Sequence, residues 1–105
     1  IYIENEKGSK NMFIQLNKNQ SQVLATLFYN NRAGRKYMTL RSIKEQCRFE
    51  KAAFTAGCLA RLVNEGFVET ETQELLDNTV RNFFYIPDEV MEKLNTIVSF
   101  EIKER

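Results

Sequence analysis

The sequence has 105 residues, enough for one domain with a single modest hydrophobic core. It contains no histidine, which excludes histidine-based acid–base catalysis, Ser-His and Cys-His nucleophile pairs, and Cys/His zinc sites. The formal net charge is only +1, but segment 32–61 has eight basic and two acidic residues, whereas segment 62–105 has four basic and ten acidic residues.

The domain is predicted to span 12–98. Residues 1–11 are predicted to be an N-terminal extension, in which Ile1-Tyr2-Ile3 could add a short strand, and residues 99–105 a C-terminal tail.

A first helix is predicted over 18–29, with Asn17 as its N-cap residue. Its apolar residues recur at the spacing of one helical face: Val23, Leu24, Leu27 and Phe28. The segment that follows, 30–36, combines turn-forming residues with three positive charges and is predicted to be a loop. A very short strand at 37–38 could come after this loop.

Two helices joined by a turn at 47–50 are predicted next. The first covers 40–46, and Thr39 is a suitable N-cap residue for it. The second covers 51–65, and Gly66 is expected to end it, because glycine readily adopts the left-handed conformation that closes a helix. The inner face of this third helix is predicted to consist of Thr55, Cys58, Leu59, Leu62 and Val63.

Two strands, 67–71 and 79–86, are predicted to form a hairpin across the polar loop 72–78. Pro87 stops the second strand and opens a last helix, whose start is favoured by two acidic residues at the positive end of the helix dipole. The apolar residues of this last helix are Val90, Met91, Leu94, Ile97 and Val98.

Three stretches carry a resemblance to a known family. Residues 39–43 open the second helix, and residues 58–68 are similar to a Leu-x-x-Leu-x-x-x-Gly-hydrophobic-Val signature. Residues 77–86, with the helix after them, are similar to the wing and final helix of MarR-like regulators. Over about residues 12–98 the chain therefore resembles the winged helix-turn-helix family, which includes modules of plasmid and phage replication and transfer proteins. The resemblance implies an α+β fold, a winged helix-turn-helix with a C-terminal helix after the wing.

In that family the third helix enters the major groove, while the wing and flanking loops hold the DNA backbone. The resemblance thus implies contacts with double-stranded DNA. The residues expected to make them are Arg32, Arg35, Lys36, Thr39, Arg41, Ser42, Lys44, Arg48, Lys51, Ala52, Ala56, Gly57, Arg61, Asn78 and Arg81.

Two features depart from the family pattern. The outer face of the third helix is expected to present mostly alanine and glycine, which permit close approach and contacts with thymine methyl groups but supply few hydrogen bonds. The wing is acidic, with Arg81 as its only basic residue, so phosphate affinity is expected mainly from the basic loop and the second helix. The alternative for the third helix is that its small residues pack on a protein partner.

Cys47 and Cys58 are expected to be small buried core residues, with a thiol switch as the alternative. The phenylalanines expected in the core or the hairpin, rather than in a base-stacking platform, are Phe49, Phe54, Phe67, Phe83 and Phe84.

We expect a non-enzymatic, sequence-specific double-stranded DNA-binding protein that uses no cofactor and no metal. Two cysteines without a disulfide framework suit the cytoplasm, and no run of about 18 apolar residues could span a membrane. A homodimer is expected, because the final helix and residues 1–16 offer more apolar surface than one small core needs. The expected role is transcription regulation, or an accessory function in plasmid or phage replication or conjugative transfer. The alternative is a winged-helix protein–protein docking module without DNA binding.

Overall fold

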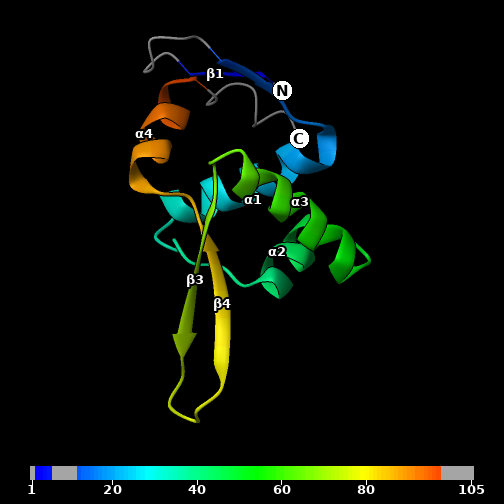
Figure 1. Ribbon diagram of the computed structural model, residues 1–105, viewed down its shortest axis with the longest axis vertical. Helices are drawn as coiled ribbons and strands as arrows, with labels where there is room; N and C mark the ends of the chain where they lie inside the picture. The colour runs from blue at the N-terminus through cyan, green and yellow to red at the C-terminus, as the bar shows by residue number, and fades with distance from the viewer. Residues whose placement is uncertain (1, 6–11, 98–105) are drawn as a thin grey trace.

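The computed structural model describes residues 2–5 and 12–97 of the chain (Figure 1). The elements in chain order are β1 (Tyr2–Asn5), β2 (Met12–Gln15), α1 (Lys18–Arg32), α2 (Leu40–Cys47), α3 (Ala52–Asn64), β3 (Glu69–Glu74), β4 (Val80–Tyr85) and α4 (Asp88–Ile97). β1 pairs with β2, and β3 pairs with β4, both antiparallel. The β3–β4 hairpin is called the wing below. The expected α+β winged-helix arrangement, with a C-terminal helix after the wing, is confirmed.

The predicted tail 99–105, most of the predicted extension 1–11, and Val98 lie outside the described residues. The strand expected at the N-terminus is present as β1, which runs antiparallel to β2 with Tyr2 opposite Gln15.

Helix α1 begins at the predicted residue and ends later than predicted. A capping box fixes its start: the Gln20 backbone N–H donates to Asn17 Oδ1 at 2.7 Å, and the Asn17 backbone N–H donates to Gln20 Oε1 at 3.1 Å. The prediction of a loop was wrong for Asn30, Asn31 and Arg32, which continue the helix. They do so because the buried side chain of Asn30 finds hydrogen-bond partners inside the fold.

The two helices after the loop lie where they were predicted, within one residue. Thr39 caps α2, since its Oγ1 accepts a hydrogen bond from the Ser42 backbone N–H at 3.2 Å. Arg48 follows α2 in a left-handed conformation with φ 61°. Lys51 is the N-cap residue of α3 rather than its first residue. Gly66, with φ 87°, closes α3 as predicted.

The loop of the wing is shorter than predicted. Its strands pair from Glu69 opposite Tyr85 to Glu74 opposite Val80, so residues 72–74, predicted to be loop, belong to β3. β3 also starts later than predicted because Phe67 and Val68, assigned to the strand, are buried in the core. Figure 1 shows that the wing projects away from the helices.

Met38 joins the loop before α2 to the base of the wing. Its backbone N–H donates to the Phe84 carbonyl oxygen at 3.0 Å, and the Phe84 N–H donates to the Met38 carbonyl oxygen at 2.7 Å. The short strand predicted at 37–38 is therefore a single bridge to β4.

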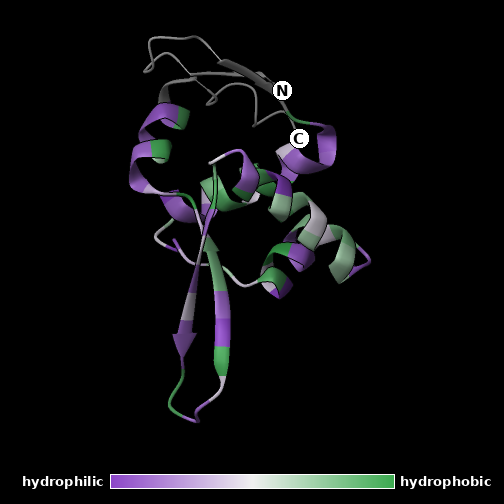
Figure 2. Ribbon diagram, viewed as in Figure 1, coloured by the Kyte–Doolittle hydropathy of each residue, from purple (hydrophilic) through white to green (hydrophobic). Residues whose placement is uncertain are grey.

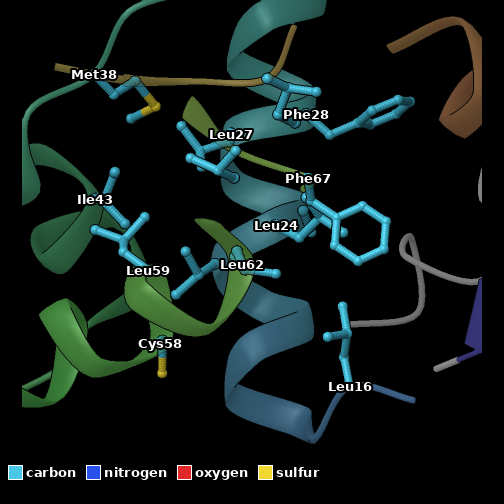
Figure 3. Packing of buried hydrophobic residues seen from close by; sticks show 14 of the residues in the cluster. Leu16, Leu24, Leu27, Phe28, Met38, Ile43, Cys58, Leu59, Leu62 and Phe67 are labelled. Atoms are coloured by element: carbon cyan, nitrogen blue, oxygen red, sulfur yellow. The ribbon is translucent and has the colours of Figure 1, made fainter. Parts of the chain in front are cut away.

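The hydrophobic core lies between α1, α2 and α3. Leu24 and Leu27 of α1, Ile43 of α2, and Leu59 and Leu62 of α3 have almost no exposed surface. Figure 3 shows these side chains directed toward one another from the three helices. Because each helix contributes one apolar face to a shared interior, the outer faces of α2 and α3 are left for other uses.

Two predicted packing positions are wrong. Val63, assigned to the inner face of α3, is 37% exposed, because it is rotated by about 100° from the buried Leu62. Phe54, expected in the core or hairpin, is 46% exposed on the outer side of α3. Both corrections add apolar surface to the outside of α3.

Helix α4 covers the same core from the side of the N-terminal strands (Figure 1). Met91 and Leu94 are buried, and Val90 packs partly against the core. Leu16, directly before α1, is also buried. These apolar residues, which the sequence suggested for a dimer contact, are thus covered within the chain.

Candidate nucleic-acid interface

The residues predicted to contact DNA occupy four parts of the structure, and none of them is buried. They are Arg32, Arg35 and Lys36 at the end of α1 and in the next loop; Thr39, Arg41, Ser42, Lys44 and Arg48 on α2 and its caps; Lys51, Ala52, Ala56, Gly57 and Arg61 on α3 and its N-cap; and Asn78 and Arg81 on the wing.

A pocket of about 400 Å³ brings four of these residues together. Arg35 and Lys36 line it from the loop, and Thr39 and Ser42 line it from the beginning of α2. The remaining lining residues are Asn30, Gly34, Tyr37, Met38, Gln46 and Phe83. None of the lining residues is acidic, so the formal charges at the pocket wall are all positive.

The Arg35 guanidinium is held in position by Asn30. Arg35 Nε donates to Asn30 Oδ1 at 3.0 Å, and the Arg35 backbone N–H donates to the Asn30 carbonyl oxygen at 2.8 Å. Asn30 is only 6% exposed, and its Nδ2 donates to the Thr26 carbonyl oxygen at 2.8 Å and to Gln46 Oε1 at 2.9 Å. Because the contact uses only Nε, the two terminal amino groups of Arg35 are available for an anion.

Lys36 joins the loop to the wing and to α4. Its Nζ lies 3.3 Å from Asp88 Oδ1, and 5.5 Å and 5.2 Å from the ring centroids of Tyr37 and Tyr85. The two rings are themselves in contact, with centroids 5.1 Å apart. The charge of Lys36 is therefore already shared with a carboxylate and two aromatic rings.

Helix α2 presents a basic outer side. Arg41, Lys44 and Arg48 are spaced i, i+3 and i+7, which places them on the same side of the helix, opposite the buried Ile43. Arg41 Nε lies 3.2 Å from Glu45 Oε2, but both side chains are largely exposed, and such pairs contribute little to stability. This side of α2 can therefore offer its positive charges to a ligand.

The outer face of α3 consists mainly of small residues. Ala53, Gly57 and Ala60 form its outermost line, opposite the buried face. Phe54 and Val63 flank this line and are 46% and 37% exposed. The outer face of α3 is therefore apolar from Ala53 to Ala60, and the exposed polar residue Asn64 continues the line at its C-terminal end.

Charged residues stand at both ends of this face. Lys51 is exposed at the N-terminal end, beside Phe54, whose ring packs edge-to-face on Phe49 with centroids 5.0 Å apart. At the C-terminal end, Arg61 Nε lies 3.3 Å from Glu65 Oε2.

The wing carries four carboxylates, and Arg81 is its only basic residue. The Tyr85 hydroxyl donates to Glu69 Oε1 at 2.8 Å, and this hydrogen bond is the main cause that raises the pKa of Tyr85 to about 12. Asp77 Oδ1 accepts hydrogen bonds from the Thr79 hydroxyl at 2.6 Å and the Thr79 N–H at 3.1 Å, which hold the pKa of Asp77 below its ordinary value. The turn of the wing thus carries a stable negative charge.

Two exposed apolar side chains lie on either side of this turn, close to Asp77. Leu76 is fully exposed and Val80 is 61% exposed. The turn between them is ordered by two backbone hydrogen bonds, from the Leu75 N–H to the Thr79 carbonyl oxygen at 2.8 Å and from the Asn78 N–H to the Leu75 carbonyl oxygen at 2.9 Å. Figure 2 shows hydrophobic colour on both sides of the turn and hydrophilic colour at the turn itself. Asn78 has φ 68°, so its main structural part is to form the turn.

Both cysteines are free and buried, as expected of core residues. Burial raises the pKa of the Cys58 thiol, and the nearby Cys47 adds to this effect. Cys47 Sγ lies 3.3 Å from Thr26 Oγ1. These buried thiols favour the packing interpretation over the thiol switch.

Among the described residues, there is no cluster of three or more acidic or cysteine side chains that could hold a metal ion. No helix within the same residues is long and apolar enough to cross a membrane.

Comparison with known proteins gives no relative: no protein-family model matches the sequence, and no curated protein matches it significantly. Classification therefore stays at the level of the winged-helix-like fold.

Sequence reasoning missed two parts of the surface. Asn30 and Gln46 were not among the predicted site residues, because their part in holding Arg35 depends on contacts between α1, α2 and the loop. Leu76 and Val80 were read as hairpin residues, although an apolar pair within a polar loop, Leu75-Leu76, was a visible signal of an exposed apolar tip.

Proposed function

We propose that the chain binds double-stranded DNA through the outer face of α3 and the basic residues around it, without catalysing a reaction. The observation that carries this proposal is an outer face of α3 made of small residues, in a fold that also presents basic side chains on α2 and in the loop before it. A face of this kind fits the major groove, where alanine contacts thymine methyl groups, while the basic residues bind phosphates at the groove edges.

Gly57 supports a close approach by an external surface. A glycine inside a helix lowers stability by about 0.5–1 kcal/mol relative to alanine. Gly57 does not have a positive φ, and, apart from its chain neighbours and the backbone of its own helix, no atom lies within 4 Å of the position that its Cβ would take. The packing of the chain itself therefore gives no reason for glycine here, whereas the approach of a DNA groove or a protein to the α3 backbone does.

The basic residues supply the phosphate contacts in this proposal. Arg41, Lys44 and Arg48 extend along α2, and Arg35 stands at the pocket beside the first turn of α2. The terminal amino groups of Arg35, the Ser42 hydroxyl and the positive end of the α2 dipole together suit one phosphate group. The acidic wing is a poor neighbour for phosphate, so Asn78 and Arg81 are secondary in this interface.

For the biological role, we propose transcription regulation or an accessory function in plasmid or phage replication or conjugative transfer, as the winged-helix resemblance implies. We also propose that the protein acts as a homodimer on a repeated DNA site. Since Leu16, Met91 and Leu94 lie in the core, the contact between copies is assigned to residues that remain exposed.

A second candidate function is a protein-docking module. The apolar outer face of α3 and the four wing carboxylates favour this alternative, because both suit a protein surface better than a phosphate backbone. The basic residues of segment 32–61 favour DNA.

A mobility-shift experiment with duplex DNA at low and at moderate salt distinguishes the two functions. The wild-type protein is expected to bind at low salt and to lose affinity steeply as salt rises. Gly57→Glu places a carboxylate on the outermost line of α3, and affinity should fall by more than about tenfold, or about 1.4 kcal/mol. Asn95→Glu is the matched control, because it makes the same charge change at an exposed position of α4. Failure of the wild-type protein to bind any duplex at low salt would rule out the DNA function and leave docking.

A further inference from the structure

The described residues form two exposed apolar surfaces, the tip of the wing and the outer face of α3. Among the described residues, five large hydrophobic side chains are exposed, and four of them lie on these surfaces: Phe54, Val63, Leu76 and Val80. We propose that the wing tip of one copy of this chain docks on the outer face of α3 of a second copy.

The wing tip has the properties of a preformed knob. Leu76 has no cover within its own chain, and the hydrogen bonds of the turn hold it in one arrangement. The Thr79 contacts fix Asp77 directly beside it. A turn whose backbone is already ordered loses little backbone entropy when it docks, which favours its use in an interface.

The wing is also negatively charged, and its carboxylates form no ion pair within the described residues. Its carboxylates are Glu69, Glu71, Glu74 and Asp77. Within the described residues, the ion pairs are those of Lys36 with Asp88, Arg41 with Glu45 and Arg61 with Glu65, and none of them involves a wing carboxylate. The wing can therefore offer its negative charge to a basic partner surface.

The outer face of α3 has the complementary properties. Phe54 and Val63 rise on either side of the line of Ala53, Gly57 and Ala60, which leaves a low apolar strip between two larger side chains. Basic residues stand near its N-terminal end: Arg48 and Lys51 are both exposed. An apolar knob beside Glu74 and Asp77 thus meets an apolar strip whose N-terminal end carries two basic residues and one acidic residue, Glu50.

The occupant is a second copy rather than the wing of the same molecule. The wing projects away from the helices, and its contacts with them are at its base, where Phe84 pairs with Met38 (Figure 1). Leu76, at the opposite end, is fully exposed and has no contact with α3 of its own chain. The two surfaces of one molecule are different, so the contact between copies is head-to-tail and can be repeated from copy to copy.

This contact does not depend on DNA binding, but it has a consequence if the proposed function holds. The same face of α3 would be used by the major groove and by the wing of the next copy. Duplex DNA and self-association would then compete for α3, so that duplex DNA releases assembled copies.

The experiment measures the mass of the purified full chain in solution over a wide range of protein concentration at low salt. The wild-type protein should form species larger than its basal unit, which is the species present at the lowest concentration. These larger species should dissociate as salt is raised. Leu76→Ser removes the knob, and Gly57→Glu places a carboxylate in the strip. Each variant alone should lose the larger species, while the control Asn95→Glu should assemble like the wild type.

An equimolar mixture of the two variants provides the decisive measurement. The intact wing of the Gly57→Glu protein can dock on the intact strip of the Leu76→Ser protein, whereas neither variant can dock on itself. The mixture should therefore regain an association that neither variant shows alone: a pair of copies if the basal unit is a monomer, and an alternating assembly if it is the proposed homodimer. Circular dichroism and thermal unfolding of each variant verify that these exposed substitutions leave the fold intact.

Three outcomes would overturn the inference: a wild-type protein of constant mass at all concentrations, variants that assemble like the wild type, or a mixture that does not associate. The second outcome would place any self-association on another surface, such as α4. Duplex binding is measured on the same samples, so its absence alongside normal assembly would refute the proposed function and leave this inference standing.

Discussion

Gly57, inside α3, and Gly66, just after its end, have opposite effects on the stability of the fold. Gly66 has φ 87°, a conformation that other residues adopt at a cost, and it ends the helix. Gly57 lies in the helix interior with free space around the position of its missing Cβ. The first is required by the fold, whereas the second weakens the fold and fits the proposed approach of another surface to α3.

Replacement of each glycine by alanine should therefore change stability in opposite directions. Gly57→Ala is expected to raise the free energy of unfolding by about 0.5–1 kcal/mol, because alanine restricts the unfolded chain and fits the helix. Gly66→Ala should lower it by about 1–2 kcal/mol through strain in the left-handed conformation. Urea unfolding of the two variants beside the wild type measures both changes. A loss of stability in Gly57→Ala would show that the chain itself needs this glycine.

Tyr85 provides a second test at the scale of one residue. Its pKa of about 12 has as its main cause the hydrogen bond that its hydroxyl donates to Glu69. The folded protein thus favours the protonated phenol, and the resulting stabilisation is fully present below the unfolded pKa of about 10 and is lost as the pH rises toward 12. Ultraviolet titration of Glu69→Gln should show one tyrosine with a pKa moved back toward 10, whereas Glu74→Gln should leave that titration unchanged.

At the scale of the elements, the sequence was sufficient for every helix and for both wing strands. Helix starts were the most predictable, since Asn17 and Thr39 make the hydrogen bonds that their residue types suggested. The ends were harder, because they depend on tertiary contacts. Helix α1 continues through Asn30 since Gln46, sixteen residues later, accepts its hydrogen bond, and no local pattern contains that information.

The candidate site was predictable in its charge and only partly in its geometry. The basic loop and α2 were identified from composition alone, and the outward position of Ala56 and Gly57 followed from helical spacing. The pocket beside Arg35 was not predicted, because it depends on how the loop folds back between α1 and α2 and on Phe83 of β4, which is distant in sequence. The same limit applies to Val63, whose place on the helix edge is decided by how α3 packs.

The end of α1 and the loop after it are tested together by removal of two charges. Arg32→Ala combined with Arg35→Ala should weaken binding to all duplexes similarly and reduce the slope of log affinity against log salt by about two units, since roughly one counterion is released per phosphate contact. The matched control is Lys18→Ala with Lys93→Ala, which removes two charges from α1 and α4. An unchanged slope in the loop variant, measured by fluorescence anisotropy at several salt concentrations, would remove this loop from the interface.

At the scale of the whole molecule, a net charge of +1 conceals a basic segment, 32–61, and an acidic segment, 62–105. The pI is near 7.9, where an evenly charged protein would have little affinity for any ion exchanger. Charges are screened over about 10 Å at 0.1 M salt, so a resin or a DNA backbone responds to the nearest patch rather than to the sum. The basic residues between the end of α1 and the start of α3 form such a patch, while the acidic residues follow from α3 to the C-terminus.

The chain should therefore bind a phosphate-bearing cation exchanger at pH 7.9, its own isoelectric point. The Arg32→Ala, Arg35→Ala protein should elute at clearly lower salt than the wild type, because it loses two charges from the patch. The Lys18→Ala, Lys93→Ala protein has the same net charge as that variant, yet it should elute close to the wild type, since its losses lie outside the patch. Equal shifts of the two double variants would mean that net charge alone governs retention, and the basic surface proposed for DNA would then lose its electrostatic basis.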